Sequence, residues 1–250
     1  MINSTKRFSD RVDNYVLYRP GYPVSILDLL REKCGLGNTA VIADIGSGTG
    51  ILSELFLQNG NRVYGVEPND EMRAAAERQL SQYANFTSVN GTAEATTLPD
   101  NWADFVTAGQ AFHWFKPEEA RVEFQRILKP NGWAALIWNT RDERSRFMKG
   151  YEKLLNQYAI GYGETKQSRS HEHIPGFFGS EPAIGEFPNE QIFDWKGLLG
   201  RSLSSSYAPL PGHPAYEPLL AGLRQLFMEF AEDGRIRFPY ITRVYYGRFQ

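Results

Sequence analysis

Residues 41–50 read VIADIGSGTG, and no other stretch constrains the fold of this chain as strongly. The apolar, β-branched beginning of this stretch is typical of a buried strand. The apolar run ends on Asp44, and glycines then recur at Gly46, Gly48 and Gly50. Such a turn lets the backbone approach a ligand that a Cβ atom would repel. The stretch therefore predicts a strand followed by a ligand-binding turn.

Strand and helix patterns alternate along the first 140 residues. The strand patterns are TAVIADIG, RVYGVEP, NFTSVNG, WADFVTAGQAF and WAALIWN, with PNG as a turn before the last; the helix patterns are ILSELFLQNG, NDEMRAAAERQL and PEEARVEFQRILK. This alternation favours right-handed crossovers and a parallel sheet that is covered on both faces. Ligands of such sheets bind outside the carboxyl ends of the strands. The candidate site residues therefore follow the strands, at 46–50, Glu67, 110–114 and 139–141.

The pattern changes after residue 141. DERSRFMKGYEKLLNQYAI predicts a helix, and residues 161–188 are rich in Gly, Pro, Ser and His, which predicts a long irregular segment. EQIFDWKG predicts a strand, YEPLLAGLRQLFMEFA a helix and GRIRFPYITRVYYGRF a closing strand.

Composition weakens the case for several classes of partner, although it does not exclude a local basic patch. Lys and Arg number 27 against 29 Asp and Glu, so no overall basic excess favours nucleic acid or an anionic membrane. No window approaches the ~18 apolar residues of a membrane span, and the N-terminus lacks the apolar core of a secretory signal. The single cysteine, Cys34, cannot form an internal disulfide. We therefore expect a cytoplasmic protein with no membrane or nucleic-acid partner; the sequence does not indicate its oligomeric state.

The glycine turn fits two kinds of ligand. A dinucleotide fingerprint has the spacing G-x-G-x-x-G, but Ile51 occupies the place of the third glycine counted from Gly46. Glu67 follows about twenty residues later, where an acid can accept two hydrogen bonds from ribose hydroxyls. Because both dinucleotides and adenosyl compounds carry a ribose, Glu67 does not choose between them.

The whole constellation resembles the class I S-adenosylmethionine-dependent methyltransferases, and more narrowly the type 11 small-molecule group that includes trans-aconitate methyltransferases. The resemblance covers roughly residues 8–140 and is carried by VIADIGSGTG, VYGVEPNDEM, NGTAEATTLPDNWADFVTAGQAFHWF and RILKPNGWAALIWN. It implies a three-layer, Rossmann-like α/β fold with a mostly parallel seven-stranded sheet and an antiparallel last strand. Residues 1–250 then form one domain, with an N-terminal lid and helices (1–36), a cofactor-binding core (37–140) and acceptor-side helices and closing strands (141–250).

The resemblance also implies which residues hold S-adenosylmethionine. The glycine turn and Gln110 would lie against the methionine portion, with Asp44 bracing the turn, and Glu67 would take the ribose. Thr92 stands where the family commonly has an acid, so the adenine contacts shift to neighbouring positions. The implied cofactor-binding residues are Asp44, Gly46, Ser47, Gly48, Glu67, Met72, Ala93, Glu94 and Gln110.

Acceptor-side candidates come from two further places. His113 follows the fourth strand, where its ordinary pKa near ~6.5 suits a general base, although a purely structural role is also open. Trp114 beside it is a candidate pocket wall. Tyr15, Tyr18 and Arg19 precede the first long helix, and Arg19 with Arg141 could bind an acceptor carboxylate through a bidentate fork. His171 and His173 have no third ligand at a convincing spacing, so no metal site is predicted.

We therefore predict a methyltransferase enzyme that modifies a small molecule at a carboxylate or hydroxyl oxygen. Two alternatives stay open. Amino-group nucleic-acid methyltransferases usually carry an Asn/Asp-Pro-Pro-aromatic run after the fourth strand, where this chain has GQAFHW. The other alternative is a non-catalytic module that binds S-adenosylmethionine, because a fold alone does not establish turnover.

Overall fold

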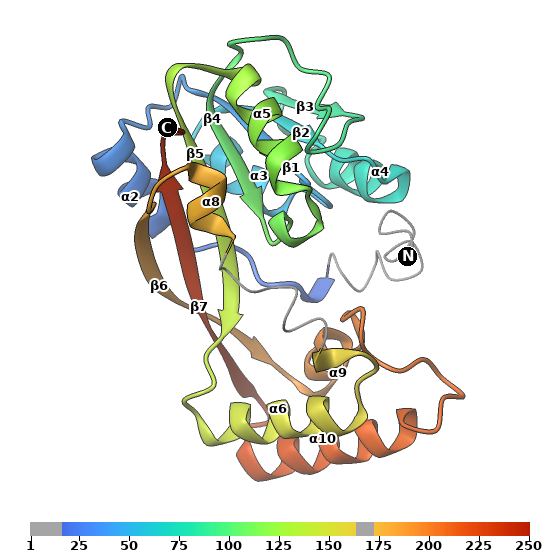
Figure 1. Cartoon of the computed structure of the whole chain (residues 1–250). Helices are drawn as coiled ribbons and strands as arrows, with labels where there is room; N and C mark the ends of the chain where they lie inside the picture. Colours follow the sequence, from blue (N-terminus) through green and yellow to red (C-terminus); the bar gives the residue numbers. More distant parts are fainter. Residues whose placement is uncertain (1–16, 164–172) are drawn as a thin grey trace.

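A seven-stranded sheet organises the protein, and its strand order is β3-β2-β1-β4-β5-β7-β6 (Figure 1). The computed structural model describes residues 17–163 and 173–250. Strands β1 to β5 pair in parallel, and β7 runs antiparallel to both β5 and β6. The predicted Rossmann-like class of fold is therefore confirmed. The strands are β1 (Val41–Ile45), β2 (Arg62–Val66), β3 (Phe86–Val89), β4 (Ala103–Gly109), β5 (Leu128–Arg141), β6 (Ala183–Phe193) and β7 (Ile236–Gly247).

Helices cover both faces of the sheet and complete three layers. On one face α2 and α3 contribute Ile26, Leu30 and Phe56 to an apolar core, and on the other α5 and α8 contribute Phe124 and Phe177. In the described part of the chain, no helix is both long and apolar enough to cross a membrane. The helices that flank the sheet are α2 (Ser25–Cys34), α3 (Ile51–Gln58), α4 (Asp70–Gln79), η3 (Phe112–Trp114), α5 (Pro117–Ile127) and α8 (Ile174–Phe178).

A third core lies beyond the sheet proper. Strands β5, β6 and β7 are the longest, and they extend past the others to the helices α6 (Arg146–Tyr158), α9 (Trp195–Leu203) and α10 (Tyr216–Phe230), drawn at the bottom of Figure 1. Phe147, Leu198, Leu223, Phe238 and Tyr240 are buried together in this third core. Because the extended strands join this core to the sheet, the helices stand opposite the carboxyl ends of β1 and β4.

One expectation about Gly and Pro residues holds in part and another is wrong. The PNG triplet falls within the bounds of β5, but it interrupts the pairing there: Asn131 has φ +67°, and the pairing with β4 shifts register between Ala103 and Phe105. An irregular segment is expected at residues 161–188, but within their described part Pro175 lies in the first turn of α8 and Gly179 caps this helix at φ +78°. Strand β6 then begins before Pro188, which an edge strand tolerates.

Candidate functional site

The glycine turn between β1 and α3 places bare backbone beside open space. Gly46 and Gly48 have φ values of +67° and +56°, a region that side chains other than glycine rarely adopt. A Cβ atom on Gly46 would lie 2.6 Å from Cβ of Ala111, so Gly46 is required for packing. A Cβ atom on Gly48 would meet nothing within 4 Å. The turn therefore packs tightly at Gly46 and is open at Gly48.

Glu67 holds this turn from the end of β2. Its carboxylate accepts a hydrogen bond from the Gly48 N–H at 3.0 Å and another from the Asn69 N–H at 3.0 Å. Burial raises the pKa of Glu67. The hydrogen bonds from the two backbone N–H groups lower this pKa, but the effect of burial is larger. A carboxylate has about four acceptor positions, so two remain for a ligand.

Asp44 braces the turn from below. Its fully buried carboxylate accepts hydrogen bonds from Ser53 Oγ at 2.6 Å and from Thr107 Oγ1 at 3.2 Å, which ties β1 to α3 and β4. Burial raises the pKa of Asp44 to about 7, although both hydroxyls lower it. Asp44 therefore titrates near neutral pH in the folded protein.

This pKa predicts a pH dependence of stability. Between the ordinary Asp pKa of ~3.9 and the native value of about 7, the folded protein keeps a proton that the unfolded chain releases. The free energy of unfolding therefore falls as pH rises through this window and levels off above it. Asp44→Asn removes this titration, so wild type is expected to lose about 2 kcal/mol relative to the variant between pH 5 and 6.5. Urea denaturation of both proteins measures this, and parallel profiles would contradict the assignment.

A cavity of about 210 Å³ opens beside the turn, between the ends of β2 and β4. His113 and Trp114 lie in this cavity, with ring centroids 4.7 Å apart. The loop that follows β3 also enters it, and Glu123 holds that loop by accepting hydrogen bonds from the Thr96 N–H at 2.7 Å and its hydroxyl at 2.5 Å. The predicted residues that the smaller cavity brings together are Arg19, Gly46, Gly48, Glu67, Met72, Ala93, Glu94, Gln110, His113 and Trp114.

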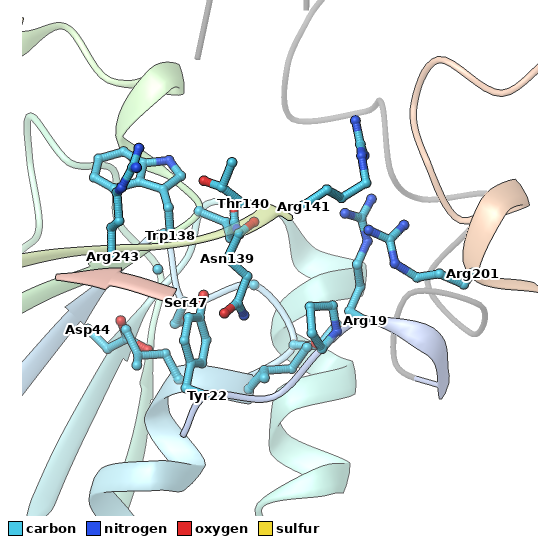
Figure 2. Close-up of a pocket in the computed structure, with 18 of the residues that line it drawn as sticks. Arg19, Tyr22, Asp44, Ser47, Trp138, Asn139, Thr140, Arg141, Arg201 and Arg243 are labelled. Carbon is cyan, nitrogen blue, oxygen red and sulfur yellow. The ribbon is translucent and has the colours of Figure 1, made fainter. Parts of the chain in front are cut away.

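A second cavity of about 430 Å³ adjoins the first (Figure 2). Asp44, Ser47 and Arg141 line only this larger cavity. Both cavities share Arg19, Gly46, Gly48, Gly109 and Gln110, so they meet at the glycine turn.

Gln110 stands at this junction in a strained conformation. Its φ is +57°, and its side chain donates a hydrogen bond to the Asn139 carbonyl at 2.8 Å while its N–H donates to the Ile137 carbonyl at 2.9 Å. A left-handed conformation costs a residue other than glycine about 1–3 kcal/mol, and such strain concentrates at functional sites. The end of β5 thus fixes Gln110 between the two cavities.

Arginines gather at one end of the larger cavity. Figure 2 shows Arg19, Arg141 and Arg201 together at this end, with Trp138 and Arg243 at the other. The three come from distant parts of the chain: the segment before α2, the end of β5 and the end of α9.

The two arginines on β5 and α9 have different surroundings. Arg141 pairs with Glu152 at 2.5 Å, and its guanidinium also donates to the hydroxyls of Tyr207, at 2.9 Å, and Tyr162. Its charge is therefore balanced within the protein.

Arg201 has no such balance. It is only 3% exposed and donates to Tyr240 Oη at 2.9 Å and Ser205 Oγ at 3.3 Å. Within residues 17–163 and 173–250, no carboxylate forms an ion pair with it. A buried charge is normally paired, and an arginine stays charged, so the larger cavity is suited to an anion. Sequence reasoning missed Arg201 because it belongs to no motif; the only indication was a lone arginine in the weakly charged helix WKGLLGRSL.

The remaining predicted residues lie at different distances from the cavities. Tyr15 and His171 fall outside the described residues. Tyr18 lines neither cavity; its ring packs against Gly200, whose Cβ position would lie 2.1 Å from it. Arg19 lines both cavities and donates to the Ser204 carbonyl at 3.1 Å.

The sequence of this chain matches known methyltransferases. A family described as "Methyltransferase domain" matches residues 43–136. An uncharacterized methyltransferase of Schizosaccharomyces pombe is 33% identical over 213 residues, which cover 85% of this chain and 82% of the relative. A second methyltransferase-like protein of that organism is 33% identical over 154 residues, or 61% of this chain. An uncharacterized methyltransferase of Mycobacterium tuberculosis is 34% identical over 150 residues, or 60% of this chain. The chain matches only 59% of the length of each of these last two relatives.

Solved structures share the fold. A type II methyltransferase from Anaeromyxobacter dehalogenans aligns with a TM-score of 0.66 at 20% identity, over 92% of this chain and 98% of that one. Phosphoethanolamine N-methyltransferase 2 of Haemonchus contortus, in complex with phosphomonomethylethanolamine and S-adenosylhomocysteine, aligns with a TM-score of 0.55 at 17% identity, over all of this chain and 61% of that one. Sheet order, family match and the relative aligned over most of its length agree: the chain belongs to the class I methyltransferases, whose cofactor is S-adenosylmethionine.

Proposed function

We propose that the protein transfers the methyl group of S-adenosylmethionine to a carboxylate oxygen of a small anionic acceptor. The cofactor occupies the smaller cavity and the glycine turn, and the acceptor occupies the larger cavity. This proposal places the protein in the type 11 small-molecule group, near the trans-aconitate methyltransferases. The observation that carries it is Arg201, a buried guanidinium in the larger cavity with no carboxylate partner among the described residues.

The chemistry of the smaller cavity and its glycine turn fits S-adenosylmethionine. Gly48 leaves space where a Cβ atom would project, Glu67 keeps two acceptor positions for ribose hydroxyls, and the buried Thr49 hydroxyl has no hydrogen-bond partner among the described residues. Gly46, Ser47, Gly48 and Gln110 would hold the methionine portion, with Asp44 bracing the turn. Met72, Ala93 and Glu94 would border the adenine.

A substitution at Gly48 tests the glycine turn. Gly48→Ala is expected to weaken S-adenosylhomocysteine binding about tenfold or more, because its methyl group projects into the cofactor's space and overpacking costs about 1–3 kcal/mol. The left-handed φ adds a loss of about 1–2 kcal/mol in stability. Gly35→Ala is the matched control, with φ +72° and likewise nothing within 4 Å, but outside both cavities. Calorimetric titration measures the affinities. If Gly48→Ala bound S-adenosylhomocysteine as tightly as wild type and Gly35→Ala do, the glycine turn would not be part of the cofactor site.

The acceptor determines what the protein has to supply. When bound, S-adenosylmethionine supplies an electrophilic methyl carbon for an in-line displacement. A carboxylate acceptor is already ionised and needs no base. The larger cavity would therefore act by orientation and by exclusion of water, and orientation alone can contribute about 7–11 kcal/mol. Because His113 and Trp114 line the smaller cavity and not the larger one, we assign them to the cofactor and give His113 no proton-transfer role.

An acceptor screen tests the proposed function. The protein is incubated with S-adenosylmethionine labelled in its methyl group and with mono-, di- and tricarboxylic acids, each beside its neutral amide. We expect label to be transferred to one class of acid and to none of the amides, and mild base to release it as methanol, as a methyl ester requires. Base-stable label would indicate a hydroxyl or amine acceptor, and label in RNA or DNA a nucleic-acid enzyme. Cofactor binding without turnover on any substrate would favour the non-catalytic module.

A further inference from the structure

We propose that Tyr240 and Gln191 are positioning residues, which fix the Arg201 guanidinium for anion binding without touching the anion. The inference rests on the proposed function, since it concerns how the acceptor site is held. Tyr240 lies on β7 and Gln191 on the neighbouring edge strand β6. Neither residue lines either cavity.

The hydrogen bonds between these residues have a fixed direction. An arginine only donates, so the Tyr240 hydroxyl must accept from Arg201 Nε, at 2.9 Å. The hydroxyl proton is then directed to Gln191 Oε1, also at 2.9 Å. The Gln191 amide donates in turn to the Tyr18 carbonyl at 3.2 Å. Each group in this chain therefore sets the orientation of the next.

The network also reaches the second arginine of the cluster. Its last acceptor, the carbonyl of Tyr18, precedes Arg19 directly, and Arg19 donates to the Ser204 carbonyl at 3.1 Å. Ser204 is bound back to Arg201, because its hydroxyl donates to the Arg201 carbonyl at 2.8 Å. The positions of Arg19 and Arg201 are thus set together by contacts outside the cavity.

Two of the five N–H groups of Arg201 are used by the described residues, on Tyr240 and Ser205. The Ser205 contact is long, at 3.3 Å, so the Tyr240 hydroxyl is the stronger restraint on the guanidinium. The phenyl rings of Phe238 and Tyr240 lie 5.4 Å and 5.8 Å from its Cζ and limit its movement sideways. Removing the hydroxyl would therefore release the end of the side chain and leave the cavity lining in place.

The test measures two affinities in the same variants. Citrate serves as the anion, titrated by calorimetry into protein saturated with S-adenosylhomocysteine, and S-adenosylhomocysteine is titrated separately. Tyr240→Phe is expected to weaken citrate binding about tenfold and to leave S-adenosylhomocysteine affinity within about twofold. Gln191→Leu is also expected to weaken citrate binding and to leave S-adenosylhomocysteine affinity unchanged. It serves as the test variant if Tyr240→Phe does not fold.

Tyr151→Phe is the matched control. Tyr151 is buried in the same core, but its hydroxyl donates to Ser202 Oγ at 3.2 Å, whereas the hydrogen bonds of Arg201 go to Tyr240 and Ser205. The Tyr151→Phe variant should retain wild-type citrate affinity. Equal losses in Tyr151→Phe and Tyr240→Phe would overturn the inference, since general loosening of the core would explain them. Unchanged citrate affinity in both Tyr240→Phe and Gln191→Leu would also overturn it and leave the proposed function intact. If wild type bound no citrate and no acid in the screen were methylated, the proposed function would fail and the inference with it.

Discussion

Arg201→Met is expected to lower kcat/KM for the carboxylic acceptor by about a thousandfold and to leave the protein at least as stable as wild type. Loss of one partner of a buried, hydrogen-bonded charge pair costs about 2–5 kcal/mol in binding. Without an acceptor, however, the same guanidinium is a buried charge with no ion-pair partner among the described residues, and replacing buried charges by apolar groups is often neutral or stabilising. The two effects have opposite signs, which an ordinary core residue would not produce.

Two further variants separate charge from packing. Arg224→Met removes an arginine that stacks on Trp195 at 4.8 Å on an exposed part of α10, and its kinetics should match wild type. Arg201→Lys keeps a charge but lacks the planar fork, so intermediate kinetics are expected. Steady-state kinetics and thermal unfolding of Arg201→Met, Arg201→Lys and Arg224→Met test whether the charge or the packing of Arg201 matters. Wild-type kcat/KM in Arg201→Met, or a loss of S-adenosylhomocysteine binding equal to the loss of activity, would contradict the acceptor role.

The residues of the proposed cofactor half could be located from the sequence because each of them directly follows a predicted strand. The glycine turn, Glu67 and Gln110 each follow a strand directly, and parallel strands bring their carboxyl ends to one edge of the sheet. Local periodicity is enough to find such strand ends. The position after β4 likewise predicts that His113 and Trp114 lie at this edge of the sheet. It does not predict which cavity they enter, because that depends on the short helix η3.

The proposed acceptor half could not be located in this way. Arg201 reaches the cavity because α9 packs against β6 and β7 in the third core; Arg201 follows Arg141 by 60 residues along the chain. That packing depends on long-range contacts between apolar side chains, and no short motif encodes it. Arg141 shows the converse: the sequence placed it at the cavity, but not its partner Glu152, which balances its charge.

Single Gly and Pro residues gave the weakest predictions for a related reason. A proline can begin a helix, lie on an edge strand or form a turn, and composition alone predicts an irregular segment for Pro175 and Pro188. The choice among these uses depends on what the neighbouring segment packs against. Pro175 lies in the first turn of α8, and this helix is held because Phe177 and Phe178 are buried against α5.

Glu67→Ala is expected to weaken S-adenosylhomocysteine binding by at least about a hundredfold. The carboxylate is proposed to accept from the ribose hydroxyls, and each hydrogen bond to a charged group contributes about 1.5–3 kcal/mol. It also holds the Gly48 and Asn69 N–H groups, so its removal loosens the turn around the ligand. Glu71→Ala is the control, since Glu71 lies in the first turn of α4, exposed and outside both cavities. Calorimetric titration measures the affinities.

A ribose analogue separates the direct contact from the bracing of the turn. S-adenosylhomocysteine that lacks both ribose hydroxyls cannot donate to Glu67, so wild type should bind it far more weakly than the natural compound. Glu67→Ala should then weaken binding of this analogue only by the factor that comes from loosening the glycine turn. If Glu67→Ala weakens both ligands by the same factor, Glu67 acts through Gly48 and Asn69 alone and the ribose contact is wrong. A larger loss for the natural ligand, by about tenfold or more, assigns the difference to the ribose hydroxyls.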